Sequence, residues 1–290
     1  MKVPLRVATL NIWNRMEPWE KRLAAIRHEL AALSPDVFAM QEVVQVKPAS
    51  AMGNADVATE YGFDQARDIA EGLDYAICFG RNIESPYPMG NAILSRWPIL
   101  RTFVFPLPRV ETDEHRSLLF AEIKSPFGTL PVFCTHLNWK LDEGHVREVQ
   151  IRYITDQIRG LAPIAGFPPI LVGDMNAEPD SDEIRFLRGR TSLGGTSVYF
   201  ADTFALAGGS AQGATFSRKN PFAAPAREPD RRIDYIFVRG PDAAQSQAEE
   251  GRGEPLQARI CFDQPHEGVF ASDHFGVIAT ISTDRSDISA

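Results

Sequence analysis

The chain has 290 residues, of which 44% are hydrophobic and 23% are charged, a balance typical of folded globular proteins that excludes a long disordered chain. Thirty Lys and Arg residues against 38 Asp and Glu residues give a net charge of −8, which argues against a protein that coats phosphate-rich polymers. Three scattered cysteines are too few for a disulfide framework, so we expect a reducing compartment.

The amino-terminal residues have the residue pattern of a strand and lack the long apolar core of a secretory signal. No window approaches the run of about 18 apolar residues expected of a membrane-spanning helix. No basic cluster or membrane-seeking amphipathic helix stands out either. We therefore expect a cytoplasmic protein that has no stable membrane anchor and is a monomer.

The first half of the chain predicts a strand, a helix and three further strands. Residues 5–12 form a short apolar run typical of a strand. In residues 19–33 the apolar residues recur every three or four positions, as in an amphipathic helix. A second strand over 36–42 ends on a glutamate, and apolar runs at 75–80 and 91–95 predict the next two strands.

The second half continues the alternation of strands and helices. Residues 117–123 and 130–137 flank a turn and predict an antiparallel hairpin. The other predicted elements are a helix over 144–158, a short helix capped by Ser181 that ends before Gly189, and strands at 169–173, 232–238 and 276–281.

Two segments, residues 206–231 and 240–257, have the composition of surface loops, and residues 283–290 resemble a frayed tail. No second hydrophobic core flanks the two loops. We therefore expect residues 1–290 to form one domain with a mixed α/β layered fold.

Polar side chains interrupt the apolar strands, mostly where a predicted strand ends. Burying so many ionisable groups costs several kcal/mol each unless a partner or a cation compensates, so a shared polar site explains them best. The residues concerned are Asn11, Glu42, His136, Asp174, Asn176, Asp234, Asp273 and His274.

The type of these side chains indicates the metal. Carboxylate and amide oxygens are ligands for Mg²⁺, Mn²⁺ or Ca²⁺, and Mg²⁺ typically takes one or two carboxylates plus water and phosphate oxygens. Glu42 together with Asn11 fits that pattern. The sequence has no closely spaced His and Cys ligands of the HExxH kind, so a zinc hydrolase is rejected.

Seven short motifs, in this order and spacing, resemble the endonuclease/exonuclease/phosphatase superfamily over nearly the whole chain. They are LNIW at 10–13, QE at 41–42, GNAILS at 90–95, THL at 135–137, GDMN at 173–176, RIDY at 232–235 and SDH at 272–274. The resemblance implies an α/β class fold, a four-layer α/β/β/α sandwich of two packed mixed β-sheets flanked by helices. It also implies Mg²⁺-dependent hydrolysis of a phosphate ester, with Mn²⁺ as a substitute.

The resemblance also assigns roles to individual residues. Glu42 would be the main metal ligand, with Asn11 and Asp273 in the same metal region and Asn11 also near the substrate. Asp174 and Asn176 would position or deprotonate the attacking water, with Asp174 favoured as the base. Asp234 would orient His274 and raise its basicity.

Two further assignments concern the phosphate. His136 would face the scissile phosphate, and Arg116 resembles a phosphate-contacting residue suited to bidentate anion binding. Arg116 could equally belong to a solvated polar loop. The sequence does not identify the partner of His136, and Glu84 and Asn91 are two guesses.

Neither the resemblance nor the composition names the substrate. We favour a phosphodiesterase acting on nucleic acid, an endo- or exonuclease. The alternatives are a phosphatase or sphingomyelinase-like activity on a small or lipid phosphate ester, and a non-catalytic binding module that kept the fold. Trp13, Asn138 and Trp139 flank the predicted site and could stack on a base or a headgroup, although packing is slightly preferred for Trp139.

Overall fold

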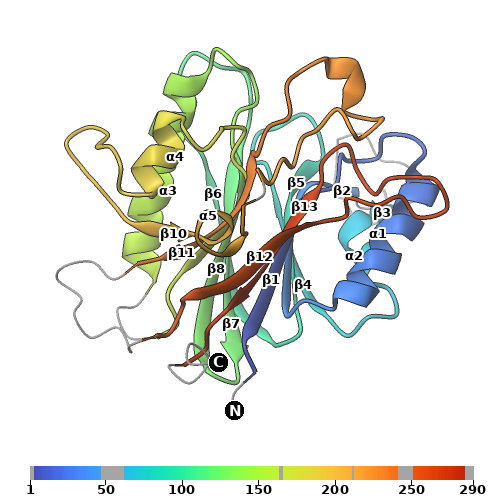
Figure 1. Cartoon of the computed structure of the whole chain (residues 1–290), viewed down its shortest axis with the longest axis horizontal. Coiled ribbons are helices and arrows are strands. Elements are labelled where there is room, and N and C mark those ends of the chain that lie inside the picture. The colour runs from blue at the N-terminus through green and yellow to red at the C-terminus, as the bar shows by residue number, and fades with distance from the viewer. Residues whose placement is uncertain (1–2, 47–61, 163–165, 211, 241–250, 285–290) are drawn as a thin grey trace, which may run out of the picture.

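The computed structural model describes residues 3–46, 62–162, 166–210, 212–240 and 251–284, which form two β-sheets packed face to face (Figure 1). Seven strands make the first sheet, in the order β12 (Pro255–Cys261), β13 (Gly276–Ile281), β1 (Leu5–Asn11), β2 (Val37–Val46), β5 (Met89–Ser95) and β4 (Ala76–Arg81), with β3 (Phe63–Asp64) paired to β2. Six strands make the second, in the order β10 (Phe200–Asp202), β11 (Asp234–Arg239), β9 (Ile170–Asp174), β8 (Gly128–His136), β7 (Ser117–Ser125) and β6 (Ile99–Pro106).

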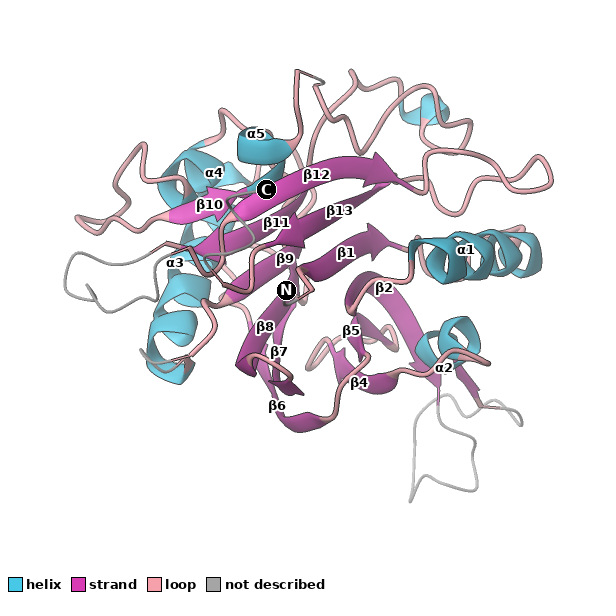
Figure 2. Ribbon diagram, turned by 60° about the horizontal axis from the view of Figure 1, so that its bottom comes forward, coloured by secondary structure: helices cyan, strands magenta, loops and turns pink. Residues whose placement is uncertain are grey.

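Helices cover the outer face of each sheet. The helices α1 (Trp19–Leu33) and α2 (Gln65–Ala70) lie beside the first sheet, whereas α3 (Gly144–Leu161) and α4 (Asp182–Leu187) lie beside the second, as Figure 2 shows. A short helix, α5 (Thr203–Ala207), follows β10, and a 3₁₀ turn spans Ala224–Ala226. The fold is the expected four-layer α/β/β/α sandwich.

Three apolar clusters fill the three spaces between these layers. Along β1, Leu5 and Val7 belong to the cluster between the sheets, whereas Ala8 and Leu10 belong to the cluster under α1. A third cluster joins the second sheet to α3 and α4. Central strands are therefore buried on both faces, which is why they read as nearly continuous apolar runs in the sequence.

Most of the predicted elements are confirmed. The helix Trp19–Leu33 and the strand Gly276–Ile281 have the predicted bounds, and β7 and β8 form the predicted antiparallel hairpin. The strand β2 does not end at Glu42 but continues to Val46 past a register shift. Ser181 does precede α4, yet its hydroxyl accepts a hydrogen bond from the Glu178 N–H and does not cap the helix.

Several elements were not predicted, and the strands among them lie mainly at sheet edges. Both β6 and β12 are edge strands in which most side chains are at least partly exposed, so their apolar patterns are weak. The assignment of residues 255–257 to a loop was therefore wrong, while residues 241–250 lie outside the described part of the chain. The tail prediction was wrong at Thr283, which is buried, and residues 285–290 also lie outside the description.

Within the described residues, none of the helices has the length and apolar character needed to cross a membrane.

Candidate active site

Strand alternation brings the predicted polar residues to one layer of the molecule. Successive side chains on a strand point to opposite faces, so residues two apart share a face. In β9, Ile170 and Val172 lie in the core between the sheets, and Asp174 follows on that same face. The same step of two places His136 after Cys134 on β8, Asp234 before Ile236 on β11 and Asn11 four residues after Val7 on β1.

The register of the second sheet sets three of these residues side by side. His136 and Asp174 are partners in the parallel pair β8–β9, and Asp234 and Asp174 are partners in the antiparallel pair β9–β11. Three residues from distant parts of the sequence thus end up adjacent.

Asp174 is the centre of the cluster, with only 1% of its surface exposed. Its Oδ2 accepts a hydrogen bond of 3.0 Å from Nδ2 of Asn11 and lies 3.4 Å from Nε2 of His136 and 3.8 Å from Nε2 of His274. Its Oδ1 accepts a hydrogen bond of 2.9 Å from the backbone N–H of Asn176. Burial and the nearby Asp234 carboxylate raise the pKa of Asp174 to about 7, although His274 opposes them.

The two histidines beside Asp174 have opposite electrostatic surroundings. Burial, reinforced by the charges of Arg116 and His274, lowers the pKa of His136 well below its ordinary value. Burial also acts to lower the pKa of His274, but the carboxylates of Asp234, Asp174 and Asp273 outweigh it and raise that pKa well above the ordinary value. The surroundings therefore favour the neutral form of His136 and the protonated form of His274.

The Nδ1 atom of His274 lies 2.9 Å from Oδ2 of Asp234, the contact of a hydrogen bond that orients the ring. Ligand atoms of Asp174, Asp234 and His274 lie within 4.8 Å of one another, a spacing that a metal ion would also accept. The hydrogen bond accounts for this closeness without a metal. Oδ1 of Asp234 is buried and has no hydrogen-bond partner among the described residues.

Glu42 lies on the first sheet, at the register shift of β2 between Met40 and Val43. Its backbone has a φ of 58°, a left-handed conformation that is uncommon outside glycine and turns its side chain out of the regular alternation. Its two carboxylate oxygens accept hydrogen bonds from the side-chain amides of Asn11, at 3.3 Å, and Asn14, at 2.9 Å. Asn11 therefore links Glu42 to Asp174 across the two sheets.

Asp273 belongs to the same end of the molecule, in the loop before β13. Burial raises its pKa to about 6, and Glu42 adds to the increase while His274 counters it. The hydroxyl of Ser272 lies 2.6 Å from the backbone oxygen of Asn11 and 3.1 Å from Oδ1 of Asp273, so its single proton is shared between these two acceptors. The loop carrying Asp273 is thereby tied to the end of β1.

The remaining predicted residues lie at the margin of this cluster. The Asn176 side chain donates to the backbone oxygen of Leu137, at 3.1 Å. Arg116 approaches Nδ1 of His136 to 3.0 Å. Glu84 and Asn91 are not partners of His136, and that expectation was wrong: Glu84 pairs with Arg109, and Asn91 donates to the backbone oxygen of Ser117.

Sequence reasoning missed Arg22, a fully buried arginine in α1. Its guanidinium donates hydrogen bonds to the backbone oxygens of Ile12, Trp13, Asn14, Met16 and Ala271. Burial lowers its pKa to about 10, while Asp273, Glu42 and Glu17 act to raise it. Its helical spacing from Trp19 and Ile26 could have predicted that it points inward.

Arg22 thus holds together the loop that follows Asn11 and the segment that precedes Asp273. These are the two segments that bring the first-sheet residues to the cluster. Because a guanidinium has five N–H donors, five carbonyl partners satisfy it completely without any carboxylate in contact.

The flanking residues differ in their exposure. Trp139 is 56% exposed, so the preference for packing was wrong, whereas Asn138 is fully buried. The half-buried Trp13 packs against Phe222, with ring centroids 5.1 Å apart. Only Trp139 of these three presents a large aromatic surface to solvent.

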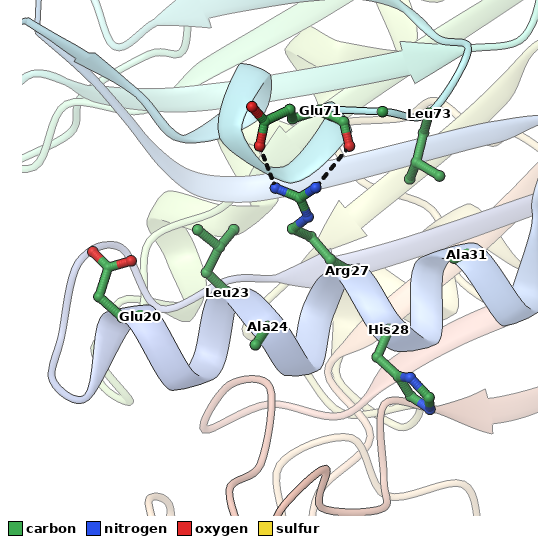
Figure 3. A pocket seen from close by; sticks show the side chains of 9 residues that line it. Glu20, Leu23, Ala24, Arg27, His28, Ala31, Glu71 and Leu73 are labelled. Atoms are coloured by element: carbon green, nitrogen blue, oxygen red, sulfur yellow. Dashed lines mark hydrogen bonds and ion pairs between the residues drawn. The ribbon is translucent and has the colours of Figure 1, made fainter.

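A separate groove of about 560 Å³ lies beside α1 and the end of α2 (Figure 3). Arg27 crosses it and donates to a Glu71 carboxylate oxygen at 2.6 Å and to the Glu71 backbone oxygen at 2.9 Å. The groove shares no lining residue with the cluster around Asp174, so it is not part of the candidate site.

Comparison with known proteins identifies the family of the chain. Residues 8–274 match the profile of the endonuclease/exonuclease/phosphatase family. The chain belongs to this family. This is a family of phosphoesterases, whose members generally use a divalent metal. A comparison with curated protein sequences found no match.

Solved structures share the fold at low sequence identity. An endonuclease/exonuclease/phosphatase from Bacteroides vulgatus is 19% identical over 97% of this chain and 99% of its own, with a TM-score of 0.70. TDP2 from D. rerio, solved in complex with a single-strand DNA product, is 19% identical over 97% of this chain and 100% of its own, with a TM-score of 0.68. A conserved protein of unknown function from Enterococcus faecalis V583 is 20% identical over 96% of this chain and 99% of its own, with a TM-score of 0.69.

Proposed function

We propose that the protein is a Mg²⁺-dependent phosphodiesterase that hydrolyses nucleic acid by in-line attack of water. The observation that carries this proposal is the setting of Asp174, a buried carboxylate with a pKa near 7 that lies between two histidines and is bonded through Asn11 to Glu42. A group that titrates near neutral pH is suited to take a proton from water.

The first-sheet residues fit a hard divalent cation. Glu42, Asn11 and Asp273 offer oxygen donors, and the raised pKa of Asp273 reflects in part the repulsion from Glu42, which a cation would offset. We propose that these three residues hold the metal, Mg²⁺ or Mn²⁺ as its substitute. When bound, the metal neutralises charge that develops on the phosphate oxygens and on the leaving oxygen.

The second-sheet residues would handle the proton. Asp174 accepts it from the attacking water, and the backbone N–H of Asn176 holds the Asp174 carboxylate by a hydrogen bond of 2.9 Å. The side-chain oxygen of Asn176 is proposed to orient the same water. A positioned base of this kind typically accelerates a reaction by about 10²- to 10⁴-fold.

The protonated His274 would supply positive charge to the phosphate. Asp234 keeps its ring oriented through the 2.9 Å contact with Nδ1, which leaves Nε2 directed toward Asp174 and the reacting atoms. His136 would face the scissile phosphate from the other side of Asp174. Arg116 remains a proposed phosphate contact through Nη2, since its Nε and Nη1 are bonded to Glu114 and His136.

Nucleic acid is the proposed substrate for two reasons. TDP2 from D. rerio, which has a similar fold, was solved in complex with a single-strand DNA product, and this supports a DNA strand as the substrate. In addition, Trp139 exposes an aromatic ring three residues after His136, where a base could stack. A net charge of −8 means that such contacts would be local.

The test compares bis-p-nitrophenyl phosphate, p-nitrophenyl phosphate, a single-stranded DNA oligonucleotide and sphingomyelin, each with Mg²⁺ and with EDTA. Turnover of the diester and of DNA that EDTA abolishes supports the proposal. Preference for the monoester or for sphingomyelin would favour the phosphatase or sphingomyelinase-like alternative, and no metal-dependent turnover on any substrate would favour the binding module.

A further inference from the structure

Arg116 makes a contact that restricts the protonation of His136. Its Nη1 lies 3.0 Å from Nδ1 of His136, and both side chains are at least nine-tenths buried. A guanidinium can only donate hydrogen bonds, so Nδ1 of the imidazole must accept. The ring proton is then on Nε2, which lies 3.4 Å from Oδ2 of Asp174.

A second contact fixes the guanidinium itself. Glu114 accepts a hydrogen bond from Nε of Arg116 at 3.3 Å, and its side chain is only 14% exposed. The backbone oxygen of Arg116 also accepts a hydrogen bond of 2.9 Å from the N–H of Leu107. Glu114, Arg116, His136 and Asp174 therefore form a continuous chain of contacts that runs from a loop into the site.

Three charged groups face His136, and two of them oppose its protonation. Arg116 and His274 are cations that disfavour a second ring proton, in the same direction as burial, whereas Asp174 is the one carboxylate in contact with the ring. His274 shows the reverse arrangement, because its Nδ1 meets the Asp234 carboxylate. The same residue type is thus set to opposite states by the group at Nδ1.

We propose that Arg116 and Glu114 are positioning residues that hold His136 as the neutral Nε2–H tautomer, so that His136 meets the substrate as an uncharged hydrogen-bond donor. The tautomer is a property of the protein alone. Only its consequence for the phosphate rests on the proposed function, so the two ideas can fail separately.

The experiment is a ¹H–¹⁵N correlation of the histidine rings in the metal-free protein, recorded between pH 5 and pH 8. His136→Gln identifies the signals by their loss. We expect the wild-type ring to show a protonated Nε2 and an unprotonated Nδ1 at every pH. An Nδ1–H tautomer, or a doubly protonated ring at pH 7, would overturn the proposal whether or not the protein turns over any substrate.

The variants test whether Arg116 is the cause. Arg116→Gln should let His136 titrate within the range, with its midpoint raised by at least about one pH unit, because a buried cation has been removed. Arg116→Lys keeps a charged donor and should preserve the wild-type pattern. Arg109→Gln is the matched control, since the exposed Arg109 makes a similar 3.1 Å contact with Nε2 of the half-buried His115 and should leave His136 unchanged. An unaltered His136 in Arg116→Gln would refute the positioning role.

Discussion

The first sheet brings Glu42 and Asn11 to the site, residues whose carboxylate and amide groups suit a cation, whereas the second sheet brings Asp174 and His136, which suit proton transfer and hydrogen bonding to a phosphate. Asn11 is bonded to Glu42 of its own sheet and to Asp174 of the other. Neither sheet alone holds the whole of the proposed site. The proposed reaction therefore depends on how the two sheets pack against each other.

The largest effect on turnover is expected from Asp174→Asn, a substitution on the second sheet. The substitution deletes the proposed proton acceptor at nearly constant shape, so kcat should fall by about 10²- to 10⁴-fold while folding is kept. Steady-state kinetics and thermal unfolding measure the two parts. Asp36→Asn is the control. Burial also raises the pKa of Asp36, but this residue directly precedes the first residue of β2, Val37, and is not one of the cluster residues.

The wild-type pH profile sharpens the same prediction. The raised pKa of Asp174, about 7, means that the carboxyl is protonated at lower pH, so kcat/KM should decline as the pH falls through that region. A flat profile between pH 5 and pH 8, or normal turnover by Asp174→Asn, would remove Asp174 as the base.

A smaller effect on the site is expected from replacing Arg22, one of two buried arginines that hold loops beside the two sheets. Arg22→Met should lower the free energy of unfolding by about 3 kcal/mol, because the carbonyls it bonds lose their buried donor. It should also weaken Mn²⁺ binding, measured by electron paramagnetic resonance, since Arg22 positions the loops next to Asn11 and Asp273.

Arg147→Met is the matched control on the second-sheet side, where Arg147 pairs with Glu183 at 2.6 Å and bonds the backbone oxygens of Asn138 and Lys140. It should destabilise the protein without changing Mn²⁺ affinity. Equal loss of Mn²⁺ affinity in both variants would mean that general destabilisation, and not loop positioning, explains the effect.

The smallest effect is expected from Glu42→Gln on the first sheet. Loss of one carboxylate charge should raise the Mg²⁺ concentration for half-maximal rate about tenfold, as 1.4 kcal/mol of weakened binding corresponds to that factor. The titration of rate against Mg²⁺ measures it. If the half-maximal concentration does not move, Glu42 is not a ligand and the division of roles between the sheets fails.

The amino-acid sequence alone sufficed for the central strands, the long helices, the fold class and the family. Strands such as β1 and β9 are buried on both faces and are mostly apolar, so they can be recognised in the sequence without knowledge of their packing partners. The edge strands β6 and β12 each pair with a single neighbouring strand, and most of their side chains are at least partly exposed, which is why their sequence patterns did not reveal them.

For the candidate site, the sequence supplied the residue types and the alternation that sends Asn11, His136 and Asp174 to one face of their strands. It did not identify Arg116 as the neighbour of His136, nor Arg22 as the residue that ties two loops together. Those contacts join residues far apart in the chain or in different loops, and their electrostatic consequences depend on burial. Only the tertiary structure decides them, because strand periodicity specifies which way a side chain points but not what it meets there.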